Sequence, residues 1–390
     1  MDNSKLHVLF ISSWYPNKKN PLLGIFVKRH ASAVAKLCNT SSIYIYSDKT
    51  NSIEEEVEDG VYTIRIGYKQ IAYNIPLIST FVKMSRYFKA YKKAIDVYIK
   101  KKGSPDIVNL NVIFPVGIMA LYMKRELNIP YIVTEHWTGY FEEDGRYKGV
   151  LMKLLTKRVV NKASAVVTVS NDLKNKMIEK GLNNQYTVIS NIVDTELFNI
   201  PAERKLTDTT RFIHVSSLED TQKNVSGILR SFQKVHKQFN NTELIIVGNG
   251  SGRESLQEYS KELGLDDSVQ FVGEKTTFEL VNLLQQASVF ILFSNYETQA
   301  IVLLESLCCG TPVITTNVAG VREYITSENG ILIEPKDEPQ LSSSMISVIQ
   351  NKDRFKDSRN IRASVVTLVN GDTIAKQFLG VYNKVLSRDN

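Results

Sequence analysis

The sequence predicts an α/β protein made of two doubly wound domains in tandem, each with a largely parallel sheet. Short runs rich in valine and isoleucine recur, and each is followed by a turn and then by residues with helical spacing, which is typical of parallel strands joined by helices. These runs are HVLFIS, SIYIY, DIVNL, YIVTE, AVVTVS and TVIS in the first half, and RFIHVSS, ELIIVGNG, SVQFVGE, VFILFS and PVITT in the second. The length of 390 residues also exceeds that of one typical domain.

A polar stretch, PAERKLTDTT over residues 201–210, separates the two series of strands and predicts a domain boundary near residue 200. We therefore expect an N-terminal domain over residues 1–200 and a C-terminal domain over residues 201–370. The last segment, residues 371–390, has helical spacing, and we expect it to pack back on the N-terminal domain. Because such sheets bind ligands at the carboxyl ends of their strands, the two domains can face each other across a cleft that holds the chemistry.

The composition restricts the partners. The formal net charge of +7 and a pI near 9.0 favour anionic partners, which include nucleic acid, an anionic membrane surface and phosphorylated small molecules. We expect no nucleic-acid partner, because the sequence has neither an aromatic-and-basic RNA-binding motif nor a zinc-ligand spacing. An anionic membrane or a phosphorylated small molecule remains.

The location expected from the sequence is the cytoplasm. The cysteines Cys38, Cys308 and Cys309 form neither a zinc spacing nor an even disulfide framework, which fits a reducing compartment. The apolar run of residues 6–12 is typical of a first strand rather than of a signal peptide. No stretch approaches the roughly 18 to 20 apolar residues that span a bilayer, so membrane contact would be peripheral, at the inner face of the cell membrane.

The most informative segment is SNYETQAIVLLESLCCGTPVITT, residues 294–316, which follows the strand VFILF. Ser294 and Asn295 suit a helix cap, AIVLLESLCC suits a helix, and Gly310 suits the end of that helix. The loop of residues 296–300 therefore meets a helix N-terminus, where unpaired amides and the helix dipole favour a phosphate.

Two glutamates lie in this segment, Glu297 in the loop and Glu305 inside the helix. A carboxylate buried in an otherwise apolar helix needs a polar partner, and a ligand hydroxyl would serve. The alternative interpretation is that Glu305 is a solvated helix residue and Glu297 a simple N-terminal charge.

Two glutamates separated by seven residues and followed by Gly-Thr-Pro-Val resemble the signature of the retaining glycosyltransferases of family four. Further segments resemble this family in the same order, namely SSWYPNKKNPLLGIFVKRHA, DIVNLNVIFPVG, YIVTEHW, VTVSNDLKNKM, ISNIVDTELF, LIIVGNGSGRESLQ, VQFVGE and TTNVAGVREYI. The resemblance implies the glycosyltransferase-B fold, in which two Rossmann-like doubly wound domains face each other across a cleft. The first domain would bind the acceptor and the second the nucleotide sugar.

The resemblance also implies catalytic roles. Lys223, in SLEDTQKN, would neutralise the leaving diphosphate, and Glu297 would hydrogen-bond hydroxyls of the donor sugar. His136, in TEHW, would contact the donor sugar from the first domain, and Glu305 would accept hydrogen bonds from the ribose. Because a leaving diphosphate gains negative charge in the transition state, a fixed cation and amides at a helix start lower the barrier. The amides implied are those of Thr298, Gln299, Ala300 and Ile301.

The remaining residues implied at the nucleotide-sugar site come from several loops, and they are Gly24, Ser217, Asn224, Gly248 and Lys275. Taken alone, several candidates have ordinary interpretations. Gly24 would be a turn glycine rather than a point of close ligand approach, His136 a hydrogen-bonded structural histidine, and Lys223 a surface lysine.

The chain departs from the family pattern in the donor site. Where most members have Gly-Arg-Leu before the lysine, this chain has Ser216, Ser217 and Leu218, so the usual second cation is absent. Lys275 and Arg322 are the candidates to supply that charge.

Three smaller departures concern the loops around the signature. Gln299 and Ala300 stand where an aromatic residue and a glycine are usual, and Ala319 replaces the first glycine of a common pair. The donor pocket is therefore expected to differ from that of most members.

A basic amphipathic helix is predicted over residues 80–102. Its apolar positions alternate in steps of three and four, at Phe81, Met84, Phe88, Tyr91, Ile95 and Tyr98. Its other face carries Lys83, Arg86, Lys89, Lys92, Lys93 and Lys100 to Lys102 against Asp96. Either this face is solvated, or it lies near anionic headgroups, where each basic residue contributes about 1 kcal/mol.

The function expected is a retaining transfer of a hexosyl group from a UDP- or GDP-linked sugar to a glycan or lipid-linked saccharide. Such an enzyme would serve the synthesis of a surface polysaccharide such as lipopolysaccharide or capsule. No metal or other cofactor is expected, because the sequence has no Asp-x-Asp motif. Two alternatives stay open: an epimerase or phosphorylase of the same fold, and a non-catalytic protein that binds sugar nucleotides. No pyridoxal-binding lysine context is found for a phosphorylase.

Overall fold

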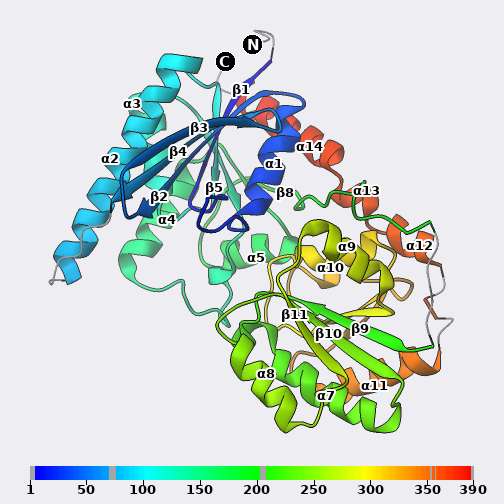
Figure 1. Cartoon of the computed structure of the whole chain (residues 1–390). Helices are drawn as coiled ribbons and strands as arrows, with labels where there is room; N and C mark the ends of the chain where they lie inside the picture. Colours follow the sequence, from blue (N-terminus) through cyan, green and yellow to red (C-terminus); the bar gives the residue numbers. More distant parts are fainter. Residues whose placement is uncertain (1–4, 70–75, 203–207, 352–353, 356, 388–390) are drawn as a thin grey trace. The chain divides into compact units, whose positions relative to one another are not determined.

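The structure is a computed structural model that describes residues 5–69, 76–202, 208–351, 354–355 and 357–387, with the backbone alone for residues 76–81. The chain divides into two compact units (Figure 1). The first unit comprises residues 1–140, 145–192 and 371–390, and the second comprises residues 141–144 and 193–370. The division falls after Ile192, earlier than the predicted boundary near residue 200, and the C-terminal segment belongs to the first unit.

The first unit is built on an eight-stranded sheet with the order β3-β4-β2-β1-β5-β6-β7-β8. All neighbouring strands are parallel except the β3–β4 pair. The strands are β1 (His7–Ser12), β2 (Asn39–Asp48), β3 (Ser52–Glu58), β4 (Val61–Lys69), β5 (Ile107–Asn111), β6 (Tyr131–Glu135), β7 (Ala165–Thr168) and β8 (Tyr186–Val188). The hairpin of β3 and β4 was not among the predicted strands.

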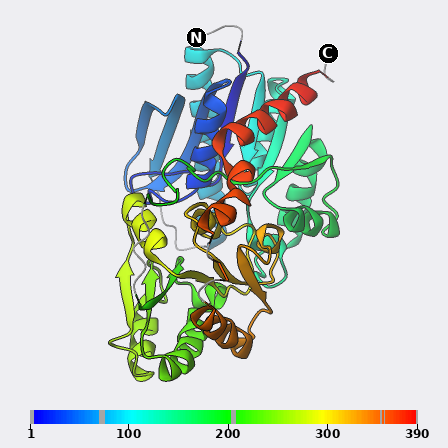
Figure 2. The same cartoon turned by 90° about the vertical axis from the view of Figure 1, so that its right-hand side faces the viewer.

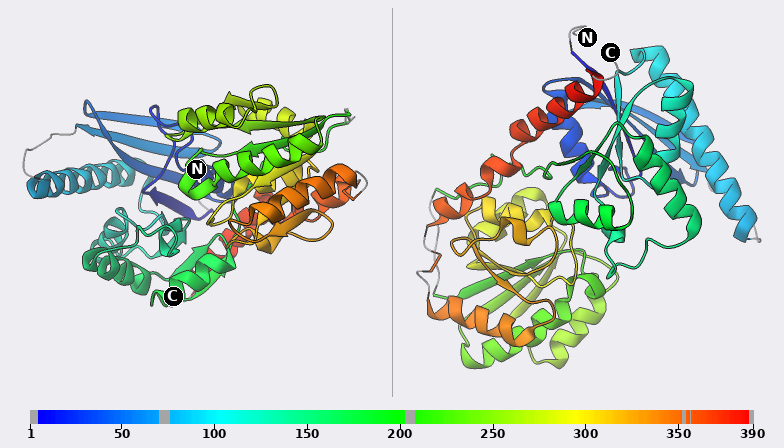
Figure 3. Two further views of the ribbon diagram at one scale, coloured as in Figure 1. Left: turned by 90° about the horizontal axis from the view of Figure 1, so that it is seen from below. Right: turned by 180° about the vertical axis from the view of Figure 1, so that it is seen from behind.

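Helices cover both faces of this sheet. The helices are α1 (Ile25–Ala35), α2 (Pro76–Lys102), α3 (Gly117–Glu126), α4 (Val150–Lys162), α5 (Asn171–Glu179) and α14 (Gly371–Leu386), with a short helix η1 (Thr138–Tyr140). Helices α2, α3 and α4 follow one another along one face, as the right panel of Figure 3 shows, and α1 and α14 pack together on the other. Right-handed crossovers put α1 and α3 on opposite faces of the sheet, because the chain moves across the sheet in opposite directions through these two helices.

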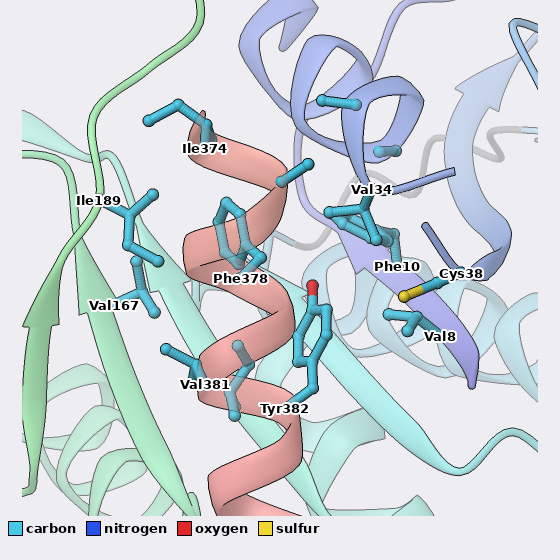
Figure 4. Packing of buried hydrophobic residues seen from close by; sticks show 14 of the residues in the cluster. Val8, Phe10, Val34, Cys38, Val167, Ile189, Ile374, Phe378, Val381 and Tyr382 are labelled. Atoms are coloured by element: carbon cyan, nitrogen blue, oxygen red, sulfur yellow. The ribbon is translucent and has the colours of Figure 1, made fainter. Parts of the chain in front are cut away.

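The C-terminal helix α14 completes the core of the first unit. Phe378 and Tyr382 are fully buried in one apolar cluster with Phe10 of β1 and Val34 of α1 (Figure 4). Figure 2 shows α14, in red, beside the blue helix α1. The amide of Asn109 donates to the Tyr382 hydroxyl at 2.8 Å, which satisfies a polar group inside this core. The end of the chain therefore contributes packing to the unit in which the chain begins.

The second unit has a parallel six-stranded sheet with the order β11-β10-β9-β12-β13-β14. Its strands are β9 (Thr210–Val215), β10 (Thr242–Val247), β11 (Val269–Gly273), β12 (Val289–Leu292), β13 (Val313–Thr316) and β14 (Gly330–Ile333). Counted within the unit this is the 3-2-1-4-5-6 order of dinucleotide-binding sheets. The prediction of two doubly wound α/β domains is thus confirmed, and the sequence patterns missed β14.

Short helices join these strands. They are α6 (Asp220–Lys223), α7 (Val225–Gln238), α8 (Arg253–Glu262), α9 (Thr277–Gln286), α10 (Ile301–Cys308), η2 (Arg322–Tyr324) and α11 (Glu338–Gln350). Two more, α12 (Ser358–Ala363) and α13 (Val366–Val369), lead out of the unit toward α14 in sequence. The guanidinium of Arg362 in α12 donates to the carbonyls of Thr195, Phe198 and Cys308 at 2.6 Å each, which fixes the start of the second unit.

Candidate functional site

The candidate site lies at the point where the strand order of the second unit reverses. Strands β9 and β12 are neighbours, but the chain leaves β9 toward β10 on one side and leaves β12 toward β13 on the other. The chain therefore leaves these two neighbouring strands in opposite directions across the sheet, and the carboxyl ends of such strands are where sheets of this type bind ligands.

An ion pair joins the two loops at this point. The ammonium group of Lys223, at the end of α6, contacts the carboxylate of Glu297 in the loop after β12. Both side chains are largely buried, with 14% and 6% of their surface exposed, and the Ser294 hydroxyl also donates to Glu297, at 2.9 Å. The sequence thus placed Lys223 and Glu297 in one site, although the structure was needed to show that they touch.

Backbone contacts hold the two loops in register. The amide of Asn295 donates to the Gln222 carbonyl at 2.8 Å, and its side chain donates to the Thr221 carbonyl at 2.8 Å. The Gln222 side chain returns a bond to the carbonyl of Tyr296 at 3.3 Å. Asn295 thus joins the loops instead of capping α10, as the sequence had suggested.

A buried histidine positions the loop after β9, and sequence reasoning missed it. His214 donates from Nδ1 to the Ile291 carbonyl at 2.9 Å, since a carbonyl can only accept. Its Nε2 then accepts from the Ser216 hydroxyl at 2.8 Å, whose oxygen accepts the amide of Leu218 at 3.1 Å. Burial lowers the pKa of His214 to about 4, so the imidazole is neutral. His214 and Ser216 are two polar residues separated by one position at the end of strand β9. This spacing is the sequence signal that could have indicated them.

Two glycines are required because loops of the site touch backbone to backbone. A Cβ on Gly248 (φ +124°) would lie 1.9 Å from the Ser216 carbonyl oxygen, and one on Gly320 (φ +73°) would lie 1.8 Å from the Thr298 oxygen. Gly248 therefore has a packing reason at this position, whatever its relation to a ligand. At both positions any side chain would push the loops apart.

The loop after β12 enters helix α10 through a left-handed residue. Ala300 has φ +55° and ψ +72° and is the N-cap of α10, and Ile301 is the first helical residue. The sequence had placed the cap at Ser294 and Asn295, which lie too far from the helix start. The left-handed conformation explains the glycine that the family usually has here, because a Cβ is strained in it. The amides around Ile301 stand at the positive end of α10.

Replacing Ala300 by glycine is expected to stabilise the second unit by about 0.5–1 kcal/mol. The change removes a strain of about 1–2 kcal/mol for a left-handed alanine, and part of this gain is lost to the greater freedom of glycine in the unfolded chain. Urea unfolding followed by circular dichroism measures the effect. Ala287→Gly is the matched control, because Ala287 has φ −74° and should lose stability instead. Equal losses in both variants would contradict the strain at Ala300.

Two polar residues of the signature are buried. Glu305 is 4% exposed in α10, which excludes the interpretation as a solvated helix residue. Gln299 is fully buried, and its amide donates to the Tyr324 hydroxyl of η2. Its position opposite Tyr324 shows how a polar side chain occupies the place of the aromatic residue usual in the family.

The other predicted residues of the second unit lie in its loops and at the ends of its helices. Asn224 has φ +48° and turns the chain from α6 into α7, and Ser217 is exposed in the loop after β9. Lys275 lies in the turn before α9, where its ammonium is 3.5 Å from Glu279. Arg322 is exposed on η2. The charge of Lys275 is thus partly compensated within its own turn.

In the first unit, His136 follows strand β6 and is buried. Its ring packs on Phe26 at 4.3 Å between centroids and lies 5.6 Å from the ring of His30. Burial and the neighbouring His30 hold the pKa of His136 well below its usual range, so its imidazole is neutral. A neutral imidazole can donate a hydrogen bond to a sugar hydroxyl or accept one from it.

The carboxylate beside His136 organises the loops of the first unit. Glu135 is fully buried and accepts the amides of Ile113, His136 and Trp137 at 2.9–3.1 Å, as well as the Tyr140 hydroxyl at 3.1 Å. Burial raises its pKa, and these donors partly offset the effect. His136 was predicted from the sequence as a site residue, whereas Glu135, its immediate neighbour, was not.

Gly24 lies at the entry to α1 in a left-handed conformation, with φ +66°. A Cβ there would lie 2.4 Å from the carbonyl of Trp14, so the loop after β1 folds directly onto this glycine. The close approach at Gly24 is made by the chain's own backbone.

Neither a membrane-spanning helix nor a metal-binding group is found among the described residues. Within the ranges described above, no helix is long and apolar enough to cross a bilayer. Within the same ranges, no three or more His, Cys, Asp or Glu side chains are grouped so that they could hold a metal ion.

The comparisons with known proteins agree with this geometry. Residues 196–364 match the family described as Glycosyl transferases group 1, and residues 23–197 match Glycosyltransferase Family 4. Among solved structures, sucrose-phosphate synthase from Thermosynechococcus elongatus superimposes with a TM-score of 0.81 at 20% identity, over 98% of this chain and 100% of that one. HepE from Anabaena, solved with UDP and glucose, gives a TM-score of 0.76 at 14% identity, over 97% and 99%.

Curated relatives match with somewhat higher sequence identity over shorter regions. Glycogen synthase from Mycobacterium tuberculosis is 27% identical over 65% of this chain and 63% of its own length. Alpha-monoglucosyldiacylglycerol synthase from Streptococcus pneumoniae is 26% identical over 62% of this chain and 58% of its own length. The matched region thus spans less than two thirds of these two relatives.

Two α/β units with largely parallel sheets, together with the superposition on sucrose-phosphate synthase over nearly the whole chain, define the class of proteins with the glycosyltransferase-B fold. Within that class, the chain belongs to the family-four-like glycosyltransferases, since the two family matches follow one another over residues 23–364.

Proposed function

We propose that the protein is a retaining glycosyltransferase that moves a hexosyl group from a nucleotide diphosphate sugar to a glycan or lipid-linked saccharide. The observation that carries this proposal is the Lys223–Glu297 ion pair at the strand reversal, beside the start of α10. It puts a buried cation, a carboxylate and a helix N-terminus at one point, which suits a diphosphate joined to a sugar.

The chemistry follows from this arrangement. The bond between the anomeric carbon and the diphosphate oxygen breaks, and the acceptor oxygen bonds to the same face of that carbon. The acceptor proton passes to the departing diphosphate oxygen, so the anomeric configuration is retained. Lys223 and the amides of residues 298–301 stabilise the negative charge that grows on the diphosphate. Glu297 would orient the sugar hydroxyls, and His136 would contact the same sugar from the first unit.

The nucleotide would lie at the strand reversal of the second unit. Glu305 would accept hydrogen bonds from the ribose hydroxyls, and Asn224, Ser217, Gly248 and Lys275 would lie in the loops around the nucleotide. UDP and GDP are the nucleotides proposed for the donor, and HepE, which shares the fold, was solved with UDP and glucose. No metal is needed in this scheme, because Lys223 supplies positive charge to the diphosphate.

The acceptor is proposed to be a saccharide of a surface polysaccharide or glycolipid. One relative is named as a glycogen synthase and another as the synthase of a glucosyl diacylglycerol, so both types of acceptor occur among similar proteins. The cytoplasm is the proposed location, because Cys38, Cys308 and Cys309 are buried thiols that are not joined in disulfides.

A peripheral contact with an anionic membrane is proposed through α2. The structure confirms the amphipathic pattern, because Tyr91, Ile95 and Tyr98 are buried. Several cations are engaged within the unit: Lys101 pairs with Glu55 at 2.6 Å, and Lys92 and Lys102 lie over the rings of Tyr122 and Tyr62.

Three other cations of α2 converge on a cavity of about 560 Å³ beside the start of β3. Its wall includes Arg86, Lys89 and Lys93 together with Asn51, Ser52 and Ile53, and no described carboxylate lines it. These three cations, spaced three and four residues apart on one helix face, are the ones that suit a lipid phosphate.

Binding of nucleotides tests the donor site. The nucleoside diphosphates UDP, GDP, ADP and dTDP and the monophosphate CMP are offered to the wild type and to Glu305→Ala, and binding is followed by thermal shift and saturation-transfer NMR. We expect one diphosphate to stabilise the wild type selectively and Glu305→Ala to lose about tenfold or more in affinity, since a hydrogen bond to a charged group is lost. Glu254→Ala, in α8, is the control and should bind like the wild type.

The same nucleotide then identifies the reaction. A matching sugar nucleotide incubated with saccharide acceptors should give a glycoside whose anomeric configuration, read by NMR, equals that of the donor, and a chelator should not change the rate. Conversion of the donor sugar without an acceptor would favour the epimerase instead. Binding without any product would favour a non-catalytic protein.

A further inference from the structure

The first turn of α4 exposes large apolar side chains. Val150 is 74% exposed, Leu151 81% and Leu154 61%, which places them among the most exposed large hydrophobic residues that the structure describes. Single exposed apolar residues are ordinary on a protein surface, but a contiguous group marks an interaction site.

The exposed residues form a second apolar face, separate from the one that anchors the helix. Thr156, Val159 and Val160 are buried against the first unit, and Val159 packs on Gly117 of α3. At 100° per residue, Val150, Leu151 and Leu154 point away from that buried face. The outward apolar residues are therefore not needed for the packing of the helix.

Positive charge continues the same outward face. Lys157 and Arg158 follow one turn beyond the apolar residues, and Lys148 and Lys153 flank them, all exposed. The helix itself, VLMKLLTKRVVNK, contains no acidic residue. An apolar tip with a surround of basic residues is the pattern of helices that lie in the interface of an anionic membrane.

The first turns of α4 and α2 lie at the same edge of the first unit. Helices α2, α3 and α4 cover the same face of the first sheet (Figure 3), and α2 and α4 each begin after a parallel strand, β4 and β6. The carboxyl ends of parallel strands lie at one edge, so the first turns of both helices belong to the same edge of the unit.

We propose that Val150, Leu151 and Leu154 insert into the surface of an anionic phospholipid bilayer while Lys157 and Arg158 contact its phosphates. The inference rests on the membrane contact of the proposed function and adds an apolar anchor on a different helix. A second copy of the chain suits this surface poorly. Three side chains offer far less than the roughly 800 Å² that each partner buries in a standard interface, and a two-fold contact would bring the basic flanks together.

The test is cosedimentation of the whole chain with vesicles of phosphatidylcholine containing phosphatidylglycerol, and with vesicles of phosphatidylcholine alone. Leu151→Ser/Leu154→Ser removes the anchor, and Lys89→Glu/Lys93→Glu removes cations of α2. Phe278→Ser, an equally exposed apolar residue (71%) in the second unit, is the matched control. We expect the leucine variant to bind anionic vesicles about tenfold to a hundredfold more weakly, and the control to bind like the wild type.

Salt separates the two contributions. Raising the ionic strength should weaken the binding of the leucine variant and of the wild type by a similar factor, because both keep the cations, and should weaken the α2 variant less, because an inserted apolar side chain is insensitive to salt. Undiminished binding of Leu151→Ser/Leu154→Ser, with loss only in the α2 variant, would overturn the anchor and leave the α2 contact standing. Absence of wild-type binding to anionic vesicles would overturn both. A wild-type dimer that the leucine variant converts to a monomer would assign the surface to a second copy instead.

Discussion

Replacement of Lys223 by alanine is expected to lower kcat/KM for sugar transfer by about 100- to 1000-fold. The ammonium group is the cation that the structure places in contact with Glu297 at the strand reversal, and loss of one preorganised group that stabilises developing charge costs this much in other enzymes. Because the diphosphate gains charge only as the bond breaks, most of the loss should appear in kcat. Steady-state kinetics with the nucleotide sugar identified by the binding panel measures it.

Two further variants separate catalysis from folding. Lys223→Ala leaves Glu297, which is 5% exposed, without its cation, so thermal unfolding must show that the variant is folded. Lys223→Arg keeps the charge and should retain more activity than Lys223→Ala. Lys234→Ala, an exposed lysine of α7, is the control and should leave kcat unchanged. Less than a threefold effect of Lys223→Ala would remove this residue from the mechanism.

Acidification is expected to destabilise both units through their buried histidines. Burial lowers the pKa of His30 and of His214 to about 4, below the value of about 6.5 in the unfolded chain. The unfolded state therefore binds protons first, and the stability present above pH 6.5 is lost as the pH falls toward 4. From pH 7.5 to 5 each histidine should cost about 2 kcal/mol of unfolding free energy.

The hydrogen bonds explain why these histidines resist protonation. His30 uses Nε2 to donate to the Ser190 carbonyl at 3.0 Å, and its Nδ1 has no hydrogen-bond partner among the described residues. In His214 a second proton would displace the bond that Nε2 accepts from Ser216. Protonation thus adds a buried charge without adding a partner for it.

The two histidines can be read separately because both tryptophans, Trp14 and Trp137, lie in the first unit. Urea unfolding at pH 7.5, 6 and 5, followed by fluorescence, reports on the first unit, and circular dichroism reports on both. His30→Gln should reduce the pH dependence seen by fluorescence without removing it, because burial also lowers the pKa of His136 in the same unit. His214→Gln should reduce only the part seen by circular dichroism. The raised pKa of Glu135 acts in the opposite direction but is common to both variants. An unchanged pH dependence in both variants would contradict the role of these groups.

The sequence was sufficient for the parts of the fold that depend on local pattern. Most strands appear as apolar runs because parallel strands are buried on both faces. Strand β3, SIEEEVE, was missed because it lies at the edge of the sheet and carries exposed glutamates, so it shows no apolar run. Strand β14 is short, with four residues, and partly exposed.

The site was predicted only in part, because some of its residues show a local sequence pattern and others do not. The spacing of Glu297 and Glu305 and the position of Lys223 are properties of the sequence, and their resemblance to a family pointed to them before any contact was known. His214 and Glu135 were not predicted, because their importance depends on hydrogen-bond partners distant in sequence. His214 bonds to the carbonyl of Ile291, and Glu135 accepts from the amide of Ile113. No local pattern encodes such a pair.

The sequence by itself determined the two-unit α/β class, the family and the residues of its signature. The tertiary structure decided which groups meet, because an ion pair such as Lys223–Glu297 forms between loops that the order of strands brings together. The tertiary structure also decided which apolar residues are exposed to solvent. The helical pattern of α4 does not show that Val159 faces the core while Leu151 faces solvent, because only the packing of the helix on its sheet distinguishes two apolar faces.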